Sequence, residues 1–332
     1  MPEHVSSPRA ALAGSIWGVT TYFNPSRYAN KRVNYRRFRE SLKAQGLPLV
    51  AVELVHGDAP FELHEGDAEI LVQRRGGDVM WQKERMLNVG LEHLPSDCDK
   101  VVLLDADTLF RNRHWVADTA ELLEQYAFVQ PFSYAFWLSP QCTNPPERTA
   151  VTASVAYCWV HGKNVRRGVP GFALAARREV LQTQGIYDRM ILGGGDRILL
   201  SAAMGIDPAD SPNIKGHPAT LLDDARQWCQ RISAVAGHQS LGYTEGNLLH
   251  LWHGTFRNRR YGRRARLLAD FDVHHDIRVD DQGAWVWASN KPALHAGVRR
   301  YFELRNEEGS SAMTRWQRWF RSLLARRHAV FS

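Results

Sequence analysis

The 332-residue sequence has few cysteines and no long apolar run. Cys98, Cys142, Cys158 and Cys229 form no CxxC pair and show no regular spacing, so neither a zinc site nor a disulfide framework is indicated. No segment approaches the ~20 apolar residues that a membrane-spanning helix needs, and the N-terminus lacks the apolar core of a signal peptide. We therefore expect free thiols and a cytoplasmic location.

Most of the chain also lacks an excess of one charge. Lys and Arg number 42 against 35 Asp and Glu, which gives a net charge of +7. Five of the arginines lie in the last twenty residues, which hold no acid, so the rest of the chain has an excess of only two. A near-neutral body with a basic tail does not favour nucleic acid as the main partner, although it leaves that partner open.

Apolar runs alternate with helical patterns along the first third of the chain. The strands expected here cover residues 16–23, 45–54, 68–73 and 100–110. The helices expected between them cover the Arg-rich segment that ends near Lys43 and residues 81–94. Because β and α units alternate and the strands are continuously apolar, we predict an α/β fold with a mostly parallel sheet flanked by helices.

The middle of the chain is less regular. We expect a helix and an edge strand between residues 111 and 130, and an insertion or acceptor loop over 131–167. Residues 169–185 predict a short strand leading into a helix that ends at Gly185, and 193–205 predict a glycine turn that opens another helix. No internal repeat is present.

Two aspartates end the apolar strand that begins at Val101. Asp105 and Asp107 flank Ala106, and ligands of open parallel sheets bind beyond the carboxyl ends of the strands. Carboxylates at this spacing suit Mg²⁺ or Mn²⁺ bridged to substrate phosphates. The alternative is a solvated strand end or a helix cap, because Asp is favoured in both.

Two later segments carry further candidates. In HLWHG, His253 and His250 can each supply an imidazole to a metal that already has carboxylate ligands, against the alternative of a structural histidine. In GGGD, the glycines Gly193, Gly194 and Gly195 allow close approach of a ligand. Asp196 follows as a candidate general base, and its alternative role is that of a helix cap.

The order of these motifs resembles the GT-A fold glycosyltransferases, of the family 2 kind that carries a DxD motif. The resemblance covers about residues 15–260 and rests on WQKERMLN, VVLLDADTLF, PGFALAARREVL, GGGDR and HLWHG. It implies that Asp105, Ala106 and Asp107 bind a divalent cation and a nucleotide-sugar, that His253 first and His250 second complete the metal site, and that Asp196 is the base. Gly193 to Gly195 then serve the acceptor or donor sugar. The single acid departs from the commoner Gly-Gly-Glu-Asp form, which leaves the identity of the base open.

The resemblance also implies supporting positions for the nucleotide-sugar. The candidates at the ends of the first two strands are Thr20, Thr21, Tyr22, Asn24 and Glu53. Lys83 and Asn88 lie on the helix before the DxD strand, and Lys83 can meet a phosphate. Arg257 belongs to an arginine cluster over 255–266 that can close on the leaving diphosphate. For each of these residues the alternative is a charged surface or a structural side chain.

The expected organisation is a flexible N-terminus (1–14), a catalytic domain (15–270), a small C-terminal extension (271–312) and a basic amphipathic helical tail (313–332). In that tail, Trp and Leu recur at helical spacing on one side, and Arg lies on the other side. This pattern is typical of a helix in an anionic membrane interface, so a peripheral membrane location is predicted. The predicted activity is metal-dependent transfer from a UDP-sugar or a related donor to a hydroxyl of a cell-envelope glycan or glycolipid. The alternatives are a glycosyltransferase acting on modified nucleic acid, a sugar-phosphate nucleotidyltransferase, and a non-catalytic binding protein.

Overall fold

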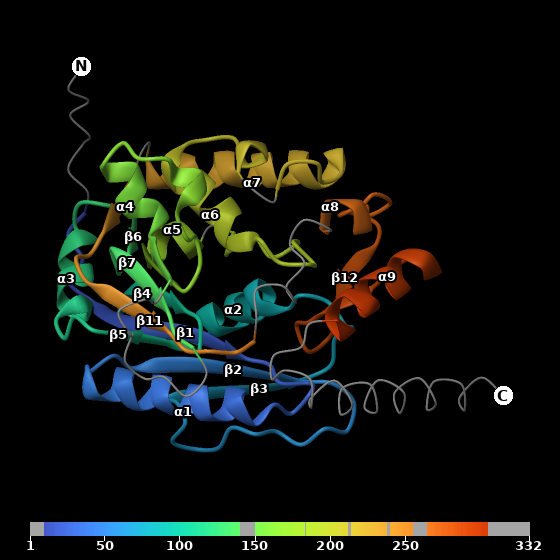
Figure 1. Ribbon diagram of the computed structural model, residues 1–332, viewed down its shortest axis with the longest axis horizontal. Helices are drawn as coiled ribbons and strands as arrows, with labels where there is room; N and C mark the ends of the chain where they lie inside the picture. The colour runs from blue at the N-terminus through green and yellow to red at the C-terminus, as the bar shows by residue number, and fades with distance from the viewer. Residues whose placement is uncertain are drawn as a thin grey trace.

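The computed structural model describes residues 10–139, 150–182, 184–211, 214–237, 240–254 and 264–304. Its centre is a seven-stranded sheet (Figure 1). In spatial order the strands are β10 (Leu241–Tyr243), β6 (Phe128–Gln130), β9 (Ala173–Arg177), β4 (Cys98–Leu104), β1 (Ser15–Tyr22), β2 (Leu49–Val55) and β3 (Ile70–Arg75). Both pairings of β9 are antiparallel, and the other neighbours pair in parallel.

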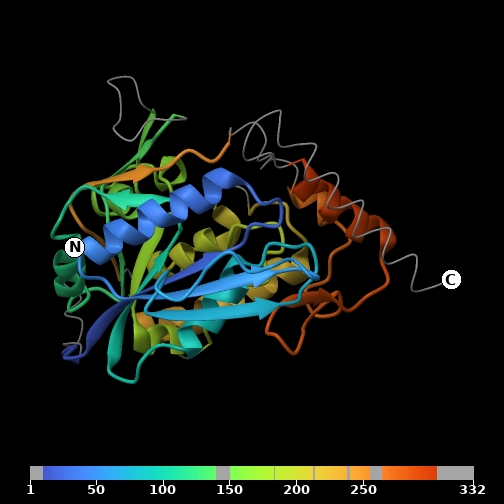
Figure 2. The ribbon, with the colours of Figure 1, turned by 90° about the horizontal axis from the view of Figure 1, so that it is seen from below.

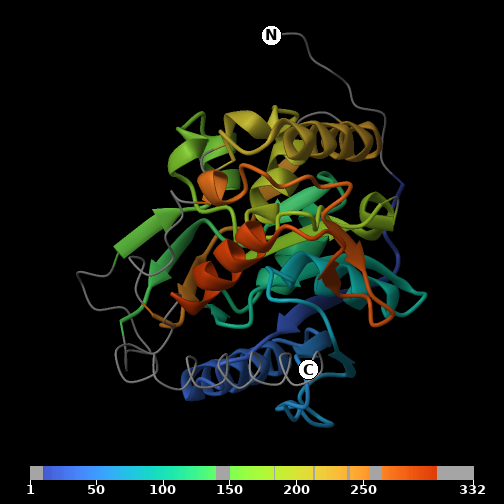
Figure 3. The same cartoon turned by 90° about the vertical axis from the view of Figure 1, so that its right-hand side faces the viewer.

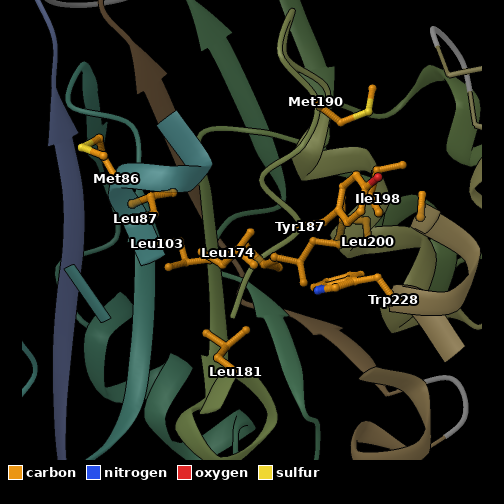
Figure 4. Close-up of a cluster of buried hydrophobic side chains, with 14 of the residues drawn as sticks. Met86, Leu87, Leu103, Leu174, Leu181, Tyr187, Met190, Ile198, Leu200 and Trp228 are labelled. Carbon is orange, nitrogen blue, oxygen red and sulfur yellow. The ribbon is translucent and has the colours of Figure 1, made fainter. Parts of the chain in front are cut away.

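Helices cover both faces of this sheet, as Figures 1 and 2 show. Alternate residues of β4 belong to different cores: Val101 and Leu103 pack with one apolar cluster, and Val102 and Leu104 with the other. The first cluster lies under α2 (Lys83–Glu92), α6 (Gly195–Met204) and α7 (Ala219–Ala236), and Figure 4 shows part of it. The second lies under α1 (Ala29–Ala44). The predicted α/β fold class is confirmed.

A second sheet of four strands corrects two predictions. Its order is β5 (Thr108–Phe110), β11 (Asn247–His250), β7 (Tyr134–Trp137) and β8 (Ala150–Ala153). The strand expected over 100–110 is therefore broken at residues 105–107, and its second part pairs antiparallel with β11 instead of continuing in the central sheet. The loop expected over 131–167 contains β7, β8, α4 (Val155–Val160) and the 3₁₀ helix η1 (Val165–Arg167).

The edge-strand prediction for the segment before residue 131 is also wrong. After α3 (Trp115–Leu122), β6 lies between β9 and β10, so that β10 occupies the edge. The sequence does not reveal this, because β10 is only three residues long and joins the sheet from far along the chain. The predicted strand and helix over 169–185 are observed as β9 and α5 (Arg178–Gln182), and η2 (Pro208–Asp210) follows α6.

The C-terminal part of the described chain packs on the main core. It comprises α8 (Arg264–Leu267), the hairpin of β12 (Ile277–Val279) and β13 (Trp285–Trp287), and α9 (Pro292–Glu303), which Figure 3 shows nearest the viewer. Gln82, just before α2, accepts a hydrogen bond from Trp285 N at 2.9 Å and donates one to Trp285 O at 2.8 Å. The domain boundary at residue 271 stays a prediction, and the tail over 313–332 lies outside the described residues.

Two further expectations concern the whole chain. Within the described residues, Cys98, Cys158 and Cys229 are free thiols and buried, whereas Cys142 lies outside them. A search of the described helices finds none whose length and apolar character would carry it across a bilayer.

Candidate functional site

A cavity of about 570 Å³ opens where β1 and β4 end. Its wall includes Asp105, Ala106 and Asp107 from the turn after β4, and Asp196 from the first turn of α6. This is the side of the sheet at which an open parallel sheet binds its ligands. Helix α9 contributes Phe302 to the lining, so segments from both halves of the chain form the cavity.

Three predicted metal ligands meet in this cavity. Asp107 Oδ2 lies 3.1 Å from His253 Nε2 and 3.8 Å from His250 Nε2, and the two imidazole nitrogens are 3.0 Å apart. One ligand atom from each residue lies within 4.8 Å of the others, the only such group of His, Cys, Asp or Glu among the residues that the structure describes. The group can therefore hold a divalent ion.

Strand pairing brings these three side chains together. His250 ends β11, which pairs with β5 so that His250 faces Thr108, the residue after Asp107. Leu251 N donates to Asp107 O at 2.8 Å, which ties the two segments at the site. The His250 ring is buried against Trp137 and Phe172, with ring centroids 4.6 Å apart in both cases. One carboxylate and two imidazoles fit a first-row transition ion better than Mg²⁺, which prefers oxygen ligands.

Asp105 is held in a different way from Asp107. Its carboxylate forms an ion pair with Lys83 through Oδ1 and accepts a hydrogen bond from Phe172 N at 3.2 Å through Oδ2. Asp105 is not part of the three-residue group around His250 and His253. Its predicted role as a metal ligand stays a prediction, and the observed contacts make it a partner of Lys83.

A short turn of unusual geometry separates Asp105 from Asp196. Phe172 has φ of +79°, in the left-handed region that a phenylalanine rarely adopts. At the preceding Gly171, a Cβ would lie 2.7 Å from Asp196 Oδ2 and 3.8 Å from Asp105 Oδ2. Both carboxylates therefore lie near Gly171, and a side chain at this position would displace the Asp196 carboxylate but not that of Asp105.

A cluster of charged side chains, of which Glu84 is the buried member, surrounds Lys83. Burial lowers the pKa of Lys83, but the negative charges of Asp105, Glu84 and Asp196 outweigh that effect and raise it overall. Burial raises the pKa of Glu84 to about 7, against the opposing charge of Lys83. A Cβ on Gly195 would meet Glu84 Cγ at 2.7 Å, so Glu84 lies directly beneath the first residue of α6.

The glycine turn before α6 adopts the conformation that its sequence favours. Gly193 and Gly194 have φ of +85° and +124°, and both line the cavity. Arg264 holds this turn from the C-terminal side: its Nη1 donates to Gly193 O at 3.0 Å, and its Nε donates to Tyr301 OH at 3.0 Å. Arg264 belongs to the predicted arginine cluster, whereas Arg257 lies outside the described residues.

Some predicted nucleotide-binding residues line the cavity and others do not. Thr21, Tyr22, Lys83 and Ala106 line it. Thr20 is fully buried, and its hydroxyl donates to Leu104 O at 2.8 Å. The geometry thus gives Thr20 a structural role between β1 and β4, because neighbouring residues of a strand point to opposite faces.

Asn24, Glu53 and Asn88 also make structural contacts away from the cavity wall. Asn24 Oδ1 accepts from Tyr28 N at 2.9 Å, which orders the turn before α1. Glu53 accepts from Glu62 N at 2.6 Å and from Gln73 Nε2 at 3.0 Å, which fixes the loop after β2. Asn88 exchanges hydrogen bonds with Ile186, accepting from N at 2.7 Å and donating to O at 2.9 Å. A sequence shows the polar side chain at a strand end or on a helix, but it does not show these distant partners.

Sequence reasoning missed several residues of the cavity. Phe172 and Gly171 were seen only as part of a strand pattern, although a Pro-Gly pair before an aromatic residue is itself a turn signal. Trp137 came from a segment that was interpreted as a loop.

Comparisons with known proteins give only remote likenesses. The sequence matches no known protein family and no curated protein. The structure of S. aureus TarS 1–349 aligns with a TM-score of 0.38 and 10% identity over 76% of this chain and 63% of that one, so this chain spans less than two thirds of it.

Two other solved structures align at a similar level. Glucosyl-3-phosphoglycerate synthase from Mycobacterium tuberculosis, in complex with Mn²⁺, uridine-diphosphate and phosphoglyceric acid, aligns with a TM-score of 0.38 and 13% identity over 77% of this chain and 76% of that one. For 4-diphosphocytidyl-2C-methyl-D-erythritol synthase from Anaerococcus prevotii, the TM-score is 0.34 and the identity 10%, over 70% and 86% of the two chains. These values assign no family to the chain, and its function is argued from its own cavity.

Proposed function

We propose that the protein is a metal-dependent glycosyltransferase that moves a sugar from a nucleoside-diphosphate sugar to an acceptor hydroxyl. The observation that carries this proposal is the meeting of Asp107, His250 and His253 in the same cavity as Lys83 and Asp196. A diphosphate leaving group requires positive charge beside it, which a cation-binding group and an ammonium supply, and an attacking hydroxyl requires a separate carboxylate as base.

Each side chain has a definite task in this reaction. Asp107, His250 and His253 would hold Mn²⁺, which supplies positive charge to the diphosphate as it leaves. Asp196 accepts the proton of the acceptor hydroxyl while that oxygen bonds to the anomeric carbon and the bond from this carbon to the diphosphate oxygen breaks. Lys83 keeps its proton and fixes the Asp105 carboxylate beside the donor.

We extend the proposal to a UDP-sugar as donor, to a hydroxyl of a cell-envelope glycan or glycolipid as acceptor, and to a cytoplasmic enzyme that meets the membrane surface through its tail. The rival nucleotidyltransferase activity lacks support, because VTTYFNPSRYAN, which covers the end of the first strand and the segment after it, has no glycine-rich phosphate loop. A nucleic-acid acceptor would show itself as binding that falls steeply with salt.

The test uses a panel of UDP-, GDP- and dTDP-sugars with Mn²⁺. We expect slow hydrolysis of one donor by the wild-type protein. Asp107→Asn should abolish metal-dependent nucleotide binding, whereas Asp196→Asn should retain that binding and lose sugar transfer. No hydrolysis and no metal-dependent binding with any donor would contradict the proposal, and normal transfer by Asp196→Asn would contradict the base assignment.

A further inference from the structure

A second hollow of about 250 Å³ adjoins the cavity on the Asp196 side. Pro170 and Arg197 line both spaces, so the hollow and the cavity meet at these two residues. Arg197 follows Asp196 in α6, and Arg197 Nη2 lies 3.4 Å from Gly168 O, on the segment that leads to the strained turn. The hollow is therefore the space beyond Arg197, next to the part of the cavity that Asp196 lines.

The inner wall of this hollow is apolar. It combines Val155 of α4, Val165 of η1, and Leu200 and Met204 of α6, with Ile206 beyond the end of that helix. Leu200 and Met204 are almost fully buried and belong to the large core, so this wall is rigid. Such a surface favours a short hydrocarbon stem and offers little to a free sugar.

Charged groups sit around the same hollow. Two guanidiniums, those of Arg166 and Arg197, line it with a single acid, Asp210, so the charge there is positive by one. The 3₁₀ helix that carries Arg166 is fixed by its cap, because Asn164 Oδ1 accepts from Arg166 N at 3.0 Å. Guanidiniums bind phosphate oxygens through paired hydrogen bonds, and a second anion beside them would offset their repulsion.

We propose that this hollow binds the acceptor, and that the acceptor carries a phosphate ester on an apolar stem. The stem lies against Val155, Val165 and Met204, and the phosphate lies between Arg166 and Arg197. The acceptor hydroxyl then points through the junction at Pro170 toward Asp196. This inference rests on the proposed glycosyltransferase function and names the class of acceptor that the same site would take.

The experiment measures binding of octyl phosphate, inorganic phosphate and octanol to the full-length protein by isothermal titration calorimetry. We expect octyl phosphate to bind at least tenfold more tightly than inorganic phosphate, because the stem buries apolar surface. Arg166→Gln and Arg197→Gln should each weaken octyl phosphate binding about tenfold and leave octanol unchanged. Val165→Trp fills the hollow and should remove the advantage of the stem.

Arg36→Gln on the exposed face of α1 is the matched control and should bind octyl phosphate as the wild type does. Equal binding of octyl phosphate and inorganic phosphate, or unchanged binding by the two arginine variants, would overturn the inference. Binding to phosphatidic acid vesicles without binding to soluble octyl phosphate would also overturn it, because a surface and not the hollow would then be responsible. Mn²⁺-dependent nucleotide binding, measured in the same samples, tests the proposed function separately.

Discussion

Asp105 and Phe172 hold each other through two hydrogen bonds. Asp105 N donates to Phe172 O at 2.8 Å, and Phe172 N donates to Asp105 Oδ2 at 3.2 Å. This pair ties the end of β4 to the turn before β9, and it keeps Phe172 at a positive φ while its ring packs on His250. Phe172 thereby contacts two parts of the site: the carboxylate that pairs with Lys83, and an imidazole of the group that can hold a cation.

The strain at Phe172 predicts an unusual order of stability between two variants. Phe172→Ala and Phe172→Gly both lose the ring, but only glycine adopts φ of +79° without strain. We expect the glycine variant to be more stable by about 1 kcal/mol in urea unfolding. At the buried Phe132, which has no positive φ, the alanine variant should be at least as stable as the glycine variant. The same order at both positions would contradict strain at Phe172.

A side chain at position 171 should reduce sugar transfer without reducing metal binding. The Cβ of Gly171→Ala would lie 2.7 Å from Asp196 Oδ2, so the carboxylate must move away from its position. We expect sugar transfer to fall about 10–100-fold while Mn²⁺ affinity stays the same. The control is Gly297→Ala on α9, whose Cβ meets Leu267 at an ordinary 3.6 Å and should leave both quantities unchanged. If Gly171→Ala transferred sugar at the wild-type rate, the proposed role of Asp196 in the reaction would be contradicted.

Because the Glu84 carboxyl is buried, we expect the protein to become less stable as the pH rises. Its folded-state pKa of about 7 lies above the ordinary value because burial disfavours the charged form. Its contribution is therefore fully present below pH 4 and is lost as the pH rises through 7, a change of roughly 3 kcal/mol. In metal-free buffer, Glu84→Gln should flatten the dependence of unfolding free energy on pH between 5 and 8. Glu92→Gln, at the exposed end of the same helix, should not. An equal pH slope in Glu84→Gln and wild type would contradict this account.

Replacing Asn88 should reduce the stability of the protein without reducing nucleotide binding. Its side chain holds the segment at Ile186 and also donates to Asp188 Oδ2 at 3.0 Å. Removing these contacts in Asn88→Ala should lower the unfolding free energy by about 1–3 kcal/mol. Nucleotide affinity measured well below the melting temperature should equal that of the wild type. A variant that is stable but has weakened nucleotide affinity would restore the donor-binding role that its sequence position suggests.

The sequence predicts the fold class and the place of the site because both follow from local patterns. Apolar runs define the strands, and the rule that ligands meet the carboxyl ends of parallel strands places Asp105 and Asp107 at the cavity. That His250 and His253 join Asp107 was inferred from a short motif and a resemblance, and its physical cause, the pairing of β11 with β5, is a long-range contact.

Other features depend on contacts that no local pattern records. At the break over residues 105–107, Asp105 is hydrogen-bonded to Phe172, which lies 67 residues further along the chain. Glu53 and Thr20 are polar and lie near strand ends, which predicts contact with a ligand, but their observed partners are a loop and a neighbouring carbonyl. Polarity near a strand end therefore predicts a site only when the side chain faces the cavity.

The most direct test of the metal centre is a titration of the protein with Mn²⁺, followed by electron paramagnetic resonance. The account predicts one tight Mn²⁺ site in the wild type that is lost in Asp107→Asn and in His253→Gln, whereas Thr20→Val retains it. Binding of Mn²⁺ that is equally tight in Asp107→Asn and His253→Gln would contradict the central claim that these side chains hold the cation.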